Sequence, residues 1–275
     1  MGQDYQVGFY SISERVRNSA SRQRKAEKII QALVRYAQHP LSSALCVDIG
    51  CSSGIITSTI ASLFGTVLGL DYDEVALRAT DSSACARVHF VRADAMRLPL
   101  GDNMVDVIIC AQVYEHVPDD ELLFQEIYRV LTPGGVVFFS GPNWLFPIEP
   151  HYFLPFLHWL PRRLANTYLR LAGQGDHYYE RSRHLWGLRR LMHRFLIRDI
   201  TLEVLQNFWL PELHGLEWII YLPELRGLKW IIRNMPMAVW KILLPVFPNF
   251  NWILHKPMRQ ENGRIRCGSI GGGET

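Results

Sequence analysis

Short apolar runs alternate with amphipathic segments between residues 44 and 140 of the chain. Each run has the length of a strand, whereas the longer segments repeat their apolar positions at helical spacing. This alternation is typical of an α/β fold, in which helices cover both faces of a parallel sheet. The predicted strands are residues 44–49, 66–71, 88–92, 105–110 and 135–140, and the predicted helices are residues 54–64, 73–81 and 119–131.

The pattern changes on both sides of this region. Residues 12–38 read as a polar, basic helix with one apolar face, and Pro40 ends it. Residues 141–164 hold five prolines, two tryptophans and three phenylalanines. The remaining predicted elements are a helix at 183–195 and strands at 196–205 and 249–257.

These changes divide the chain into five predicted regions. Residues 206–248 are far longer than an ordinary connection and carry four of the eight tryptophans, so we interpret them as an apolar insertion. The glycine-rich stretch 262–275 is predicted to be disordered. The regions are a helical segment (1–39), a ligand-binding core (40–140), an aromatic, proline-rich and basic cap (141–195), two last strands with the insertion between them (196–257), and a tail (258–275).

Composition restricts the class and the compartment. Apolar residues make up 48% of the 275 positions, which excludes disorder over most of the length. The five cysteines form no C-x-x-C pair, so we expect neither a disulfide framework nor a zinc site. Neither a signal peptide nor a spanning helix is apparent, which predicts a cytoplasmic protein, either free or held at the membrane surface.

Charge is divided along the chain. Residues 41–140 hold thirteen acidic residues against five basic ones, whereas residues 151–200 hold nine arginines against three acids. Two segments of opposite charge are expected to bind different partners. The alternative for the basic part is a solvated helix face.

A glycine turn follows the first predicted strand. Residues 44–54 read A-L-C-V-D-I-G-C-S-S-G, with Gly50 and Gly54 spaced so that the backbone can approach a ligand. The carboxylate of Asp48 would repel a pyrophosphate but suits a ligand that carries an amino group or a sulfonium. Asp71 ends the second strand, 21 residues after Gly50, where an acidic residue usually binds ribose hydroxyls.

The D-x-G-x-x-x-G pattern resembles motif I of class I S-adenosylmethionine (SAM) dependent methyltransferases, although Ser52 replaces a glycine of the commoner form. Three later segments resemble that family in the same order: V-H-F-V-R-A-D-A (88–95), E-H-V-P-D (115–119) and P-G-G (133–135). E-H-V-P-D is typical of the ubiquinone and menaquinone (type 11) group. The resemblance implies a Rossmann-like parallel sheet, with residues 249–257 as a final antiparallel strand.

The resemblance also implies SAM as the cofactor and assigns its contacts. Gly50 and Gly54 would admit the methionine part, while Asp48 would orient its amino group. Asp71 would hold the ribose. The remaining contacts would be Tyr72 against the adenine ring, Asp94 with the Ala95 amide at the adenine edge, and Gln112 at the methionine part.

Methyl transfer needs an aligned acceptor and a dry site, and it requires no metal, so we predict none. An oxygen acceptor also benefits from a base, for which histidine has a suitable pKa. His116 follows the fourth strand directly, and the alternative for it is a residue that begins a helix. His151 and His158 lie in the aromatic segment and are further candidates.

We predict a lipophilic or lipid-linked acceptor, methylated at oxygen, because tryptophan and arginine in the cap and the insertion suit a membrane surface. The alternatives are a soluble small-molecule or sugar methyltransferase whose insertion forms a homodimer, and an inactive SAM-binding subunit. A nucleic-acid substrate is not expected, since the fourth strand runs into A-Q-V-Y-E-H and not into an N-P-P-Y type sequence.

Overall fold

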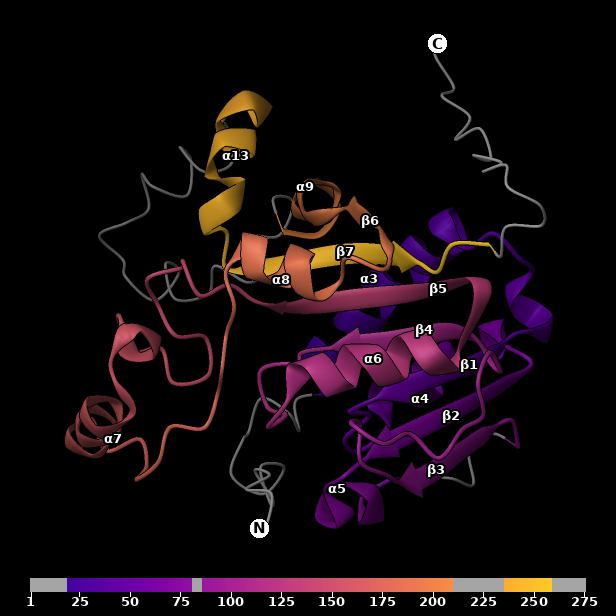
Figure 1. The fold of residues 1–275 in the computed structure, drawn as a ribbon, viewed down its shortest axis with the longest axis horizontal. Coiled ribbons are helices and arrows are strands. Elements are labelled where there is room, and N and C mark those ends of the chain that lie inside the picture. The colour runs from indigo at the N-terminus through magenta and orange to yellow at the C-terminus, as the bar shows by residue number, and fades with distance from the viewer. Residues whose placement is uncertain (1–18, 81–85, 210–234, 259–275) are drawn as a thin grey trace.

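A computed structural model describes residues 19–80, 86–209 and 235–258, which contain a seven-stranded sheet (Figure 1). The strand order is β3-β2-β1-β4-β5-β7-β6. Neighbouring strands from β3 to β5 are parallel, and β7 is antiparallel to both β5 and β6. The predicted parallel sheet with a late antiparallel strand is therefore confirmed. The strands are β1 (Leu45–Ile49), β2 (Thr66–Asp71), β3 (Val88–Arg92), β4 (Val105–Ala111), β5 (Leu131–Pro142), β6 (Leu196–Asp199) and β7 (Asn249–His255).

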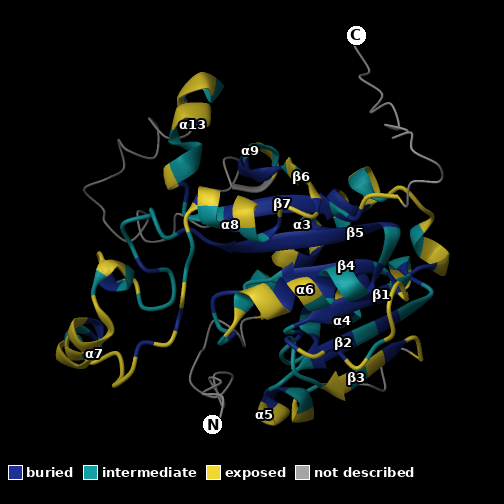
Figure 2. Cartoon of the chain, in the orientation of Figure 1, coloured by how far each residue is buried: buried dark blue, intermediate teal, exposed yellow. Residues whose placement is uncertain are grey.

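Helices cover both faces of the sheet, and the central strands are its most buried part (Figure 2). Strand β5 shows why, because successive side chains point to opposite faces. Val136 and Phe138 pack on the side of α3 and α4, whereas Val137 and Phe139 pack on the side of α6 and α8. The helices are α3 (Ser19–Tyr36), α4 (Ile55–Ile60), α5 (Glu74–Arg78), α6 (Asp120–Val130), α7 (Arg162–Leu171), α8 (Leu185–Leu191), α9 (Thr201–Val204) and α13 (Met237–Leu243).

Several predicted elements differ from the structure in their bounds: β5 is longer than the predicted strand 135–140, and α8 and α5 are shorter than the predicted helices 183–195 and 73–81. The strand expected at 196–205 ends at Asp199, because the carboxylate of Asp199 accepts a hydrogen bond from the Thr201 amide (3.0 Å) and α9 begins there. The helix expected at 54–64 is α4 followed by a 3₁₀ turn. The 3₁₀ turns are Leu41–Ser43, Ala61–Leu63, Leu157–Trp159 and Leu244–Val246, and Leu205–Trp209 is a π turn.

The aromatic segment and α7 form a lobe, residues 143–181, beyond the ends of β4 and β5 (Figure 1). Its core contains Leu157, Ala165, Leu169 and Tyr178. Of the predicted insertion, residues 210–234 lie outside the described residues, as do most of the predicted tail and the start of the predicted first helix. Among the residues that the structure describes, no helix is long and apolar enough to cross a membrane.

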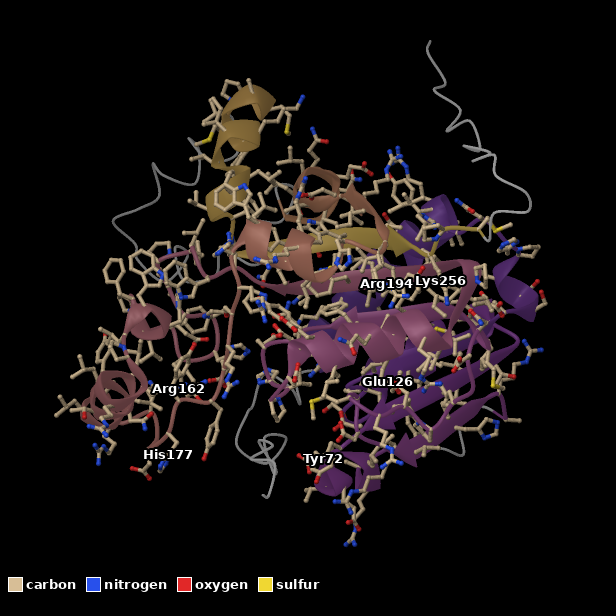
Figure 3. All side chains as sticks on the ribbon, in the orientation of Figure 1. Tyr72, Glu126, Arg162, His177, Arg194 and Lys256 are labelled. Carbon is tan, nitrogen blue, oxygen red and sulfur yellow. The ribbon has the colours of Figure 1, made fainter. Side chains whose placement is uncertain are left out.

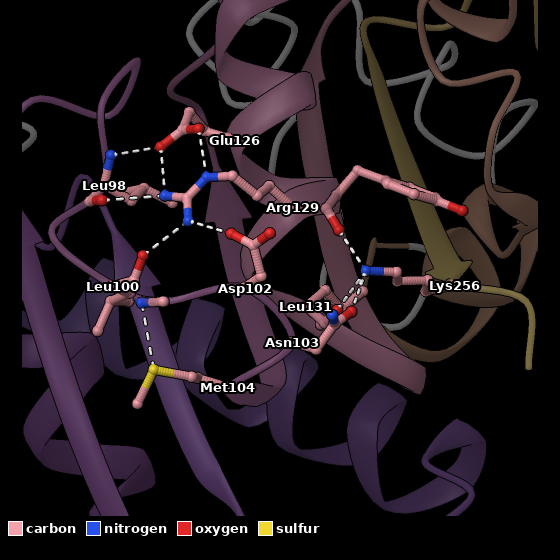
Figure 4. A network of polar contacts seen from close by, with 11 residues as sticks. Leu98, Leu100, Asp102, Asn103, Met104, Glu126, Arg129, Leu131 and Lys256 are labelled. Atoms are coloured by element: carbon pink, nitrogen blue, oxygen red, sulfur yellow. Dashed lines mark hydrogen bonds and ion pairs between the residues drawn. The ribbon is translucent and has the colours of Figure 1, made fainter. Parts of the chain in front are cut away.

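The side chain of Lys256, directly after β7, connects β7 to the end of α6 (Figure 4). Lys256 is only 8% exposed, and its Nζ donates to Asn103 Oδ1, to the Tyr128 carbonyl and to the Leu131 carbonyl, each at 2.7 Å. A positive charge at the C-terminal end of a helix is favourable because the carbonyl groups there carry partial negative charge. One side chain therefore joins the last strand to the helix layer.

Replacing Lys256 with methionine should lower the free energy of unfolding by about 1 to 3 kcal/mol, because buried carbonyl oxygens would lose their donor. Urea denaturation of the two proteins measures the difference. The matched control is Lys241→Met, on an exposed position of α13, which should change stability by less than about 0.5 kcal/mol. Equal effects of the two substitutions would show that the three hydrogen bonds contribute little.

Candidate active site

The glycine turn that follows β1 is closely packed. Gly50 (φ +72°) and Gly54 (φ +74°) both adopt the left-handed conformation that other residues rarely take. A Cβ on Gly50 would lie 2.6 Å from Val113 Cγ2, and one on Gly54 would lie 2.4 Å from Phe90 Cζ. Both glycines are therefore required for the shape of the turn.

Asp71, at the end of β2, holds this turn in place. Its Oδ2 accepts a hydrogen bond from the Ser52 amide (2.7 Å), and its Oδ1 accepts one from the Asp73 amide (2.8 Å). Ser52 has φ +53°, so it adopts the glycine-like backbone that the resemblance implies at its position. Burial raises the pKa of Asp71, although these amides oppose the shift. The N-cap of α5 is Asp73.

Asp48 lies beneath the turn and is 4% exposed. Its Oδ2 accepts a hydrogen bond from Thr57 Oγ1 (2.7 Å) in α4. Burial raises the pKa of Asp48 to about 6, against the opposing effects of Thr57 and of the nearby Arg22. Arg22, on α3, is half-buried and interacts electrostatically with both Asp48 and Asp71. Sequence reasoning missed Arg22, because nothing in the polar helix pattern marks which arginine faces the turn.

The residues assigned to adenine lie beside Asp71. Tyr72 follows it directly (Figure 3), and the Arg92 guanidinium lies 5.4 Å from the centre of its ring. The Ala93 amide donates to the Asp71 carbonyl (2.9 Å), which places Asp94 and Ala95 next to the end of β2. Asp94 Oδ1 accepts a hydrogen bond from the Met96 amide (2.8 Å) and so shapes the loop after β3.

Gln112, just past the end of β4, has an unusual backbone. Its φ is +60°, and its amide donates to the Ser140 carbonyl (2.8 Å). The side-chain Nε2 lies 3.4 Å from Ser140 Oγ and 3.4 Å from Asn249 Oδ1. Non-glycine residues held in this conformation cluster at functional sites. The next residue, Val113, is the one that packs on Gly50, so Gln112 lies close to the glycine turn.

Two of the candidate histidines, His116 and His151, lie together at the carboxyl-terminal ends of the strands, as the glycine turn does. The rings of His116 and His151 are 4.9 Å apart, edge to face. Glu115 Oε1 lies 3.9 Å from His116 Nε2 and 3.9 Å from His151 Nε2. On the other side of each ring, His116 Nδ1 lies 4.0 Å from Glu180 Oε1, and His151 Nδ1 lies 2.7 Å from Glu149 Oε1. The structure therefore brings together residues from the turn after β4 and from the lobe.

The two imidazoles differ in protonation. Burial lowers the pKa of His116 well below its usual value, so its ring is neutral at neutral pH. Burial also acts to lower the pKa of His151, but the hydrogen bond to Glu149 and the charges of Glu149, Glu180 and Glu115 together raise it to about 9. A neutral imidazole beside a charged one gives a proton acceptor next to a fixed positive charge.

His158, the third candidate, does not join this group. Its Nε2 lies 2.9 Å from the Trp144 carbonyl oxygen, and its ring packs against Trp144 and Trp159. Sequence reasoning missed Glu149 and Glu180, which are buried together with Glu115. Glu115 and Glu149 each stand within two positions of a candidate histidine, but that spacing alone does not show that residues 115, 149 and 180 meet.

Comparisons with known proteins show what part of the chain resembles. Residues 47–139 match the family described as "Methyltransferase domain". A Mycolicibacterium smegmatis protein named "Probable S-adenosylmethionine-dependent methyltransferase" is 36% identical over 120 residues, 44% of this chain and 45% of that protein. The ubiquinone biosynthesis O-methyltransferase of Cupriavidus pinatubonensis is 36% identical over 110 residues, 38% of this chain and 43% of that protein.

A solved structure extends the similarity to the whole fold. The Haemonchus contortus phosphoethanolamine N-methyltransferase 2, in complex with S-adenosyl-L-methionine, has a TM-score of 0.53 and 19% identity, over 92% of this chain and 60% of that chain. At this identity the likeness shows the fold alone. The chain spans about half the length of the curated relatives it matches.

Proposed function

We propose, from the premise that residues 47–139 are a methyltransferase domain, that the chain transfers a methyl group from SAM to an oxygen atom of a lipophilic or lipid-linked acceptor. The observation that carries this proposal is a juxtaposition. The glycine turn with Asp71 and the histidine pair with its carboxylates both lie at the carboxyl-terminal ends of the parallel strands, where α/β sheets bind their ligands.

The residues around the turn fit SAM. Gly50 and Gly54 leave no room for a side chain, and the carboxylates of Asp48 and Asp71 near the turn favour a ligand that carries a positive charge. Each Asp71 oxygen accepts one backbone hydrogen bond and retains capacity for a ribose hydroxyl. Bound SAM supplies an electrophilic methyl group on a good leaving group, so the task left to the chain is to orient the acceptor and exclude water.

The second task is to remove the proton from the hydroxyl group that receives the methyl group. His116 is neutral and its side chain is 21% exposed, so a hydroxyl of the acceptor can reach it. His151 carries the positive charge and is oriented by Glu149. This arrangement supports an oxygen acceptor, whose proton must leave as the bond to the methyl carbon forms.

A lipophilic acceptor is supported by the outer surface of the lobe and by the relative named for ubiquinone biosynthesis. On α7, Leu164 (57% exposed) and Leu171 (84% exposed) form one stripe along the helix, and the exposed Arg163 and Arg170 form the neighbouring stripe. A helix with leucines and arginines on its exposed side is typical of contact with an anionic membrane surface.

Two measurements test the proposal. Calorimetry should show binding of SAM and of its demethylated product, S-adenosylhomocysteine, and much weaker binding of NADH. Mass spectrometry of lipid extracts from cells with and without the protein should reveal a species heavier by one methylene group. Binding of NADH as strong as that of SAM would refute the donor assignment, and SAM binding without any methylated product would favour an inactive SAM-binding subunit.

The membrane contact predicts a salt-dependent association. The parent protein should co-sediment with vesicles that contain anionic lipid at low ionic strength and less at high ionic strength, since salt screens the arginines. Arg163→Glu with Arg170→Glu should reduce vesicle binding by at least roughly 30-fold, because each lost arginine contributes about 1 kcal/mol near the surface and each added glutamate is repelled by anionic lipid. The matched control replaces Arg78 and Arg97, two exposed arginines in the methyltransferase domain, with glutamate and should bind vesicles as the parent does.

Other results would lead to other conclusions. A parent protein that remains in the supernatant at low salt and runs as a dimer in sedimentation would favour a soluble acceptor and a dimer interface. Arg189 and Arg194 are poor choices for the test, because they lie over the rings of Trp252 and Tyr128 and their reversal would disturb the fold.

A further inference from the structure

The carboxylate of Glu115 is buried without the contacts that a buried carboxylate normally makes. The side chain is fully buried, and among the described residues neither Oε1 nor Oε2 has a hydrogen-bond partner. Such groups are costly, because the interior does not replace the water that a carboxylate loses. Glu115 lies in the turn after β4, so a partner that compensates this cost would stabilise it there.

Three potential ligand atoms converge beside this carboxylate. One oxygen of Glu115 and one nitrogen each of His116 and His151 lie within 4.8 Å of one another. Both imidazoles turn Nε2 toward Glu115 Oε1, at 3.9 Å each. Ligand atoms that share one zinc-sized ion lie about 3 to 4 Å apart, so small rotations of these side chains complete the set.

The ring nitrogen of each histidine that points away from Glu115, Nδ1, faces a carboxylate, as in many metal-binding histidines. His151 Nδ1 donates to Glu149 Oε1 at 2.7 Å, and His116 Nδ1 faces Glu180 Oε1 at 4.0 Å. A carboxylate behind the imidazole is the usual support of a metal-binding histidine, because it fixes the ring and the tautomer. Glu149 is itself held by the amides of His151 and Tyr152.

Protein cations balance only part of the charge of the site, where His151 is the one charged imidazole among the described residues. Three buried carboxylates, Glu115, Glu149 and Glu180, face two imidazoles. Arg162 lies nearby, but it donates to the carbonyls of Tyr178, Tyr179 and Glu180 and not to the carboxylates. An excess of negative charge in a buried site favours the uptake of a cation.

We propose that Glu115, His116 and His151 bind a divalent transition-metal ion, with Glu149 and Glu180 as the supporting carboxylates. Two imidazoles and one carboxylate suit Zn²⁺, Mn²⁺ or Fe²⁺, whereas Mg²⁺ prefers oxygen ligands. Our expectation of no metal rested on the cysteine spacing and on the chemistry of methyl transfer, and neither bears on a site of this composition.

Three protein ligands leave coordination positions for water or an acceptor oxygen. Because the side chains of His116 and His151 are 21% and 14% exposed, the site is open on that side. A cation there would lower the pKa of an acceptor hydroxyl, which would then release its proton to solvent before methyl transfer. This consequence rests on the proposed function, but binding of the ion does not. In that case His116 acts as a ligand and not as the base.

The test is calorimetry on untagged full-length protein that has been stripped with a chelator and returned to buffer at neutral pH. Zn²⁺ and Mn²⁺ are the probes, with no SAM or acceptor present. We expect saturable binding at one site and a higher melting temperature with the ion. Glu115→Gln should weaken binding at least about 100-fold, since even supporting residues contribute about 10- to 100-fold.

The control is His193→Ala, which removes an exposed histidine outside the site and should bind as the parent does. If circular dichroism shows that Glu115→Gln does not fold, His151→Asn gives the same comparison. No saturable binding by the parent, or equal binding by the parent and the site variants, would overturn the proposal. SAM calorimetry on the same samples separates this failure from failure of the proposed function.

Discussion

Replacing His116 with alanine is expected to lower the rate of methyl transfer by about 10²- to 10⁴-fold. The neutral ring lies between two buried carboxylates at the edge of the sheet, and its loss removes the group that handles the acceptor proton. Affinity for SAM should change little, because the ring of His116 lies against His151 and the carboxylates of Glu115 and Glu180, which are outside the glycine turn. The assay follows transfer of a labelled methyl group from SAM to lipid extracted from cells that lack the protein.

His193→Ala is the matched control for this substitution and should retain the parental rate. An unchanged rate in His116→Ala would move the role to His151 or remove the need for a base. A variant that no longer binds SAM would show that His116 is structural. Whether His116 acts as a base or as a metal ligand is decided by a chelator, which should inhibit the parent only in the second case.

Replacing Asp71 with alanine is expected to weaken SAM binding by about ten- to hundredfold, or roughly 1.5 to 3 kcal/mol. Two effects contribute. The ribose hydroxyls lose a charged acceptor, and the amides of Ser52 and Asp73 lose the carboxylate that holds the turn. Calorimetry of the parent and the variant measures the ratio of the two affinities.

A second variant separates these effects. Asp71→Asn keeps a hydrogen-bond acceptor for the turn but removes the charge, so its affinity should lie between those of the parent and Asp71→Ala. Asp176→Ala, at an exposed position of the lobe, should bind SAM as the parent does. Equal affinity of Asp71→Ala and the parent would remove Asp71 from the donor site.

The sheet could be predicted from the sequence because its determinants are local. The runs that become β1, β2 and β4 are short, apolar and separated by amphipathic segments, so period and length alone identify them. The predicted end of β6 was wrong, and the reason is equally local. Residues 196–205 are apolar enough for a strand, but Asp199 Oδ1 accepts a hydrogen bond from the Thr201 amide, which turns the chain away from the sheet, and α9 begins at Thr201.

The candidate site could be predicted only in part. The glycine turn and Asp71 follow from spacing, since consecutive strand ends of a parallel sheet meet at one edge. The carboxylates around the histidines could not be found in this way. Glu115 lies in the turn after β4 and Glu180 lies in the lobe, and their approach depends on how the lobe packs, which no periodicity encodes.

The position of β7 between β5 and β6 determines when the sheet can be completed during synthesis. More than 100 residues of chain separate β5 from β7, so the growing chain exposes an unpaired edge of β5 until Asn249–His255 has left the ribosome. Such an edge can pair with another chain and cause aggregation. Folding of this protein in the cell therefore depends on its last strand, and a chaperone has its longest opportunity to act before that strand arrives.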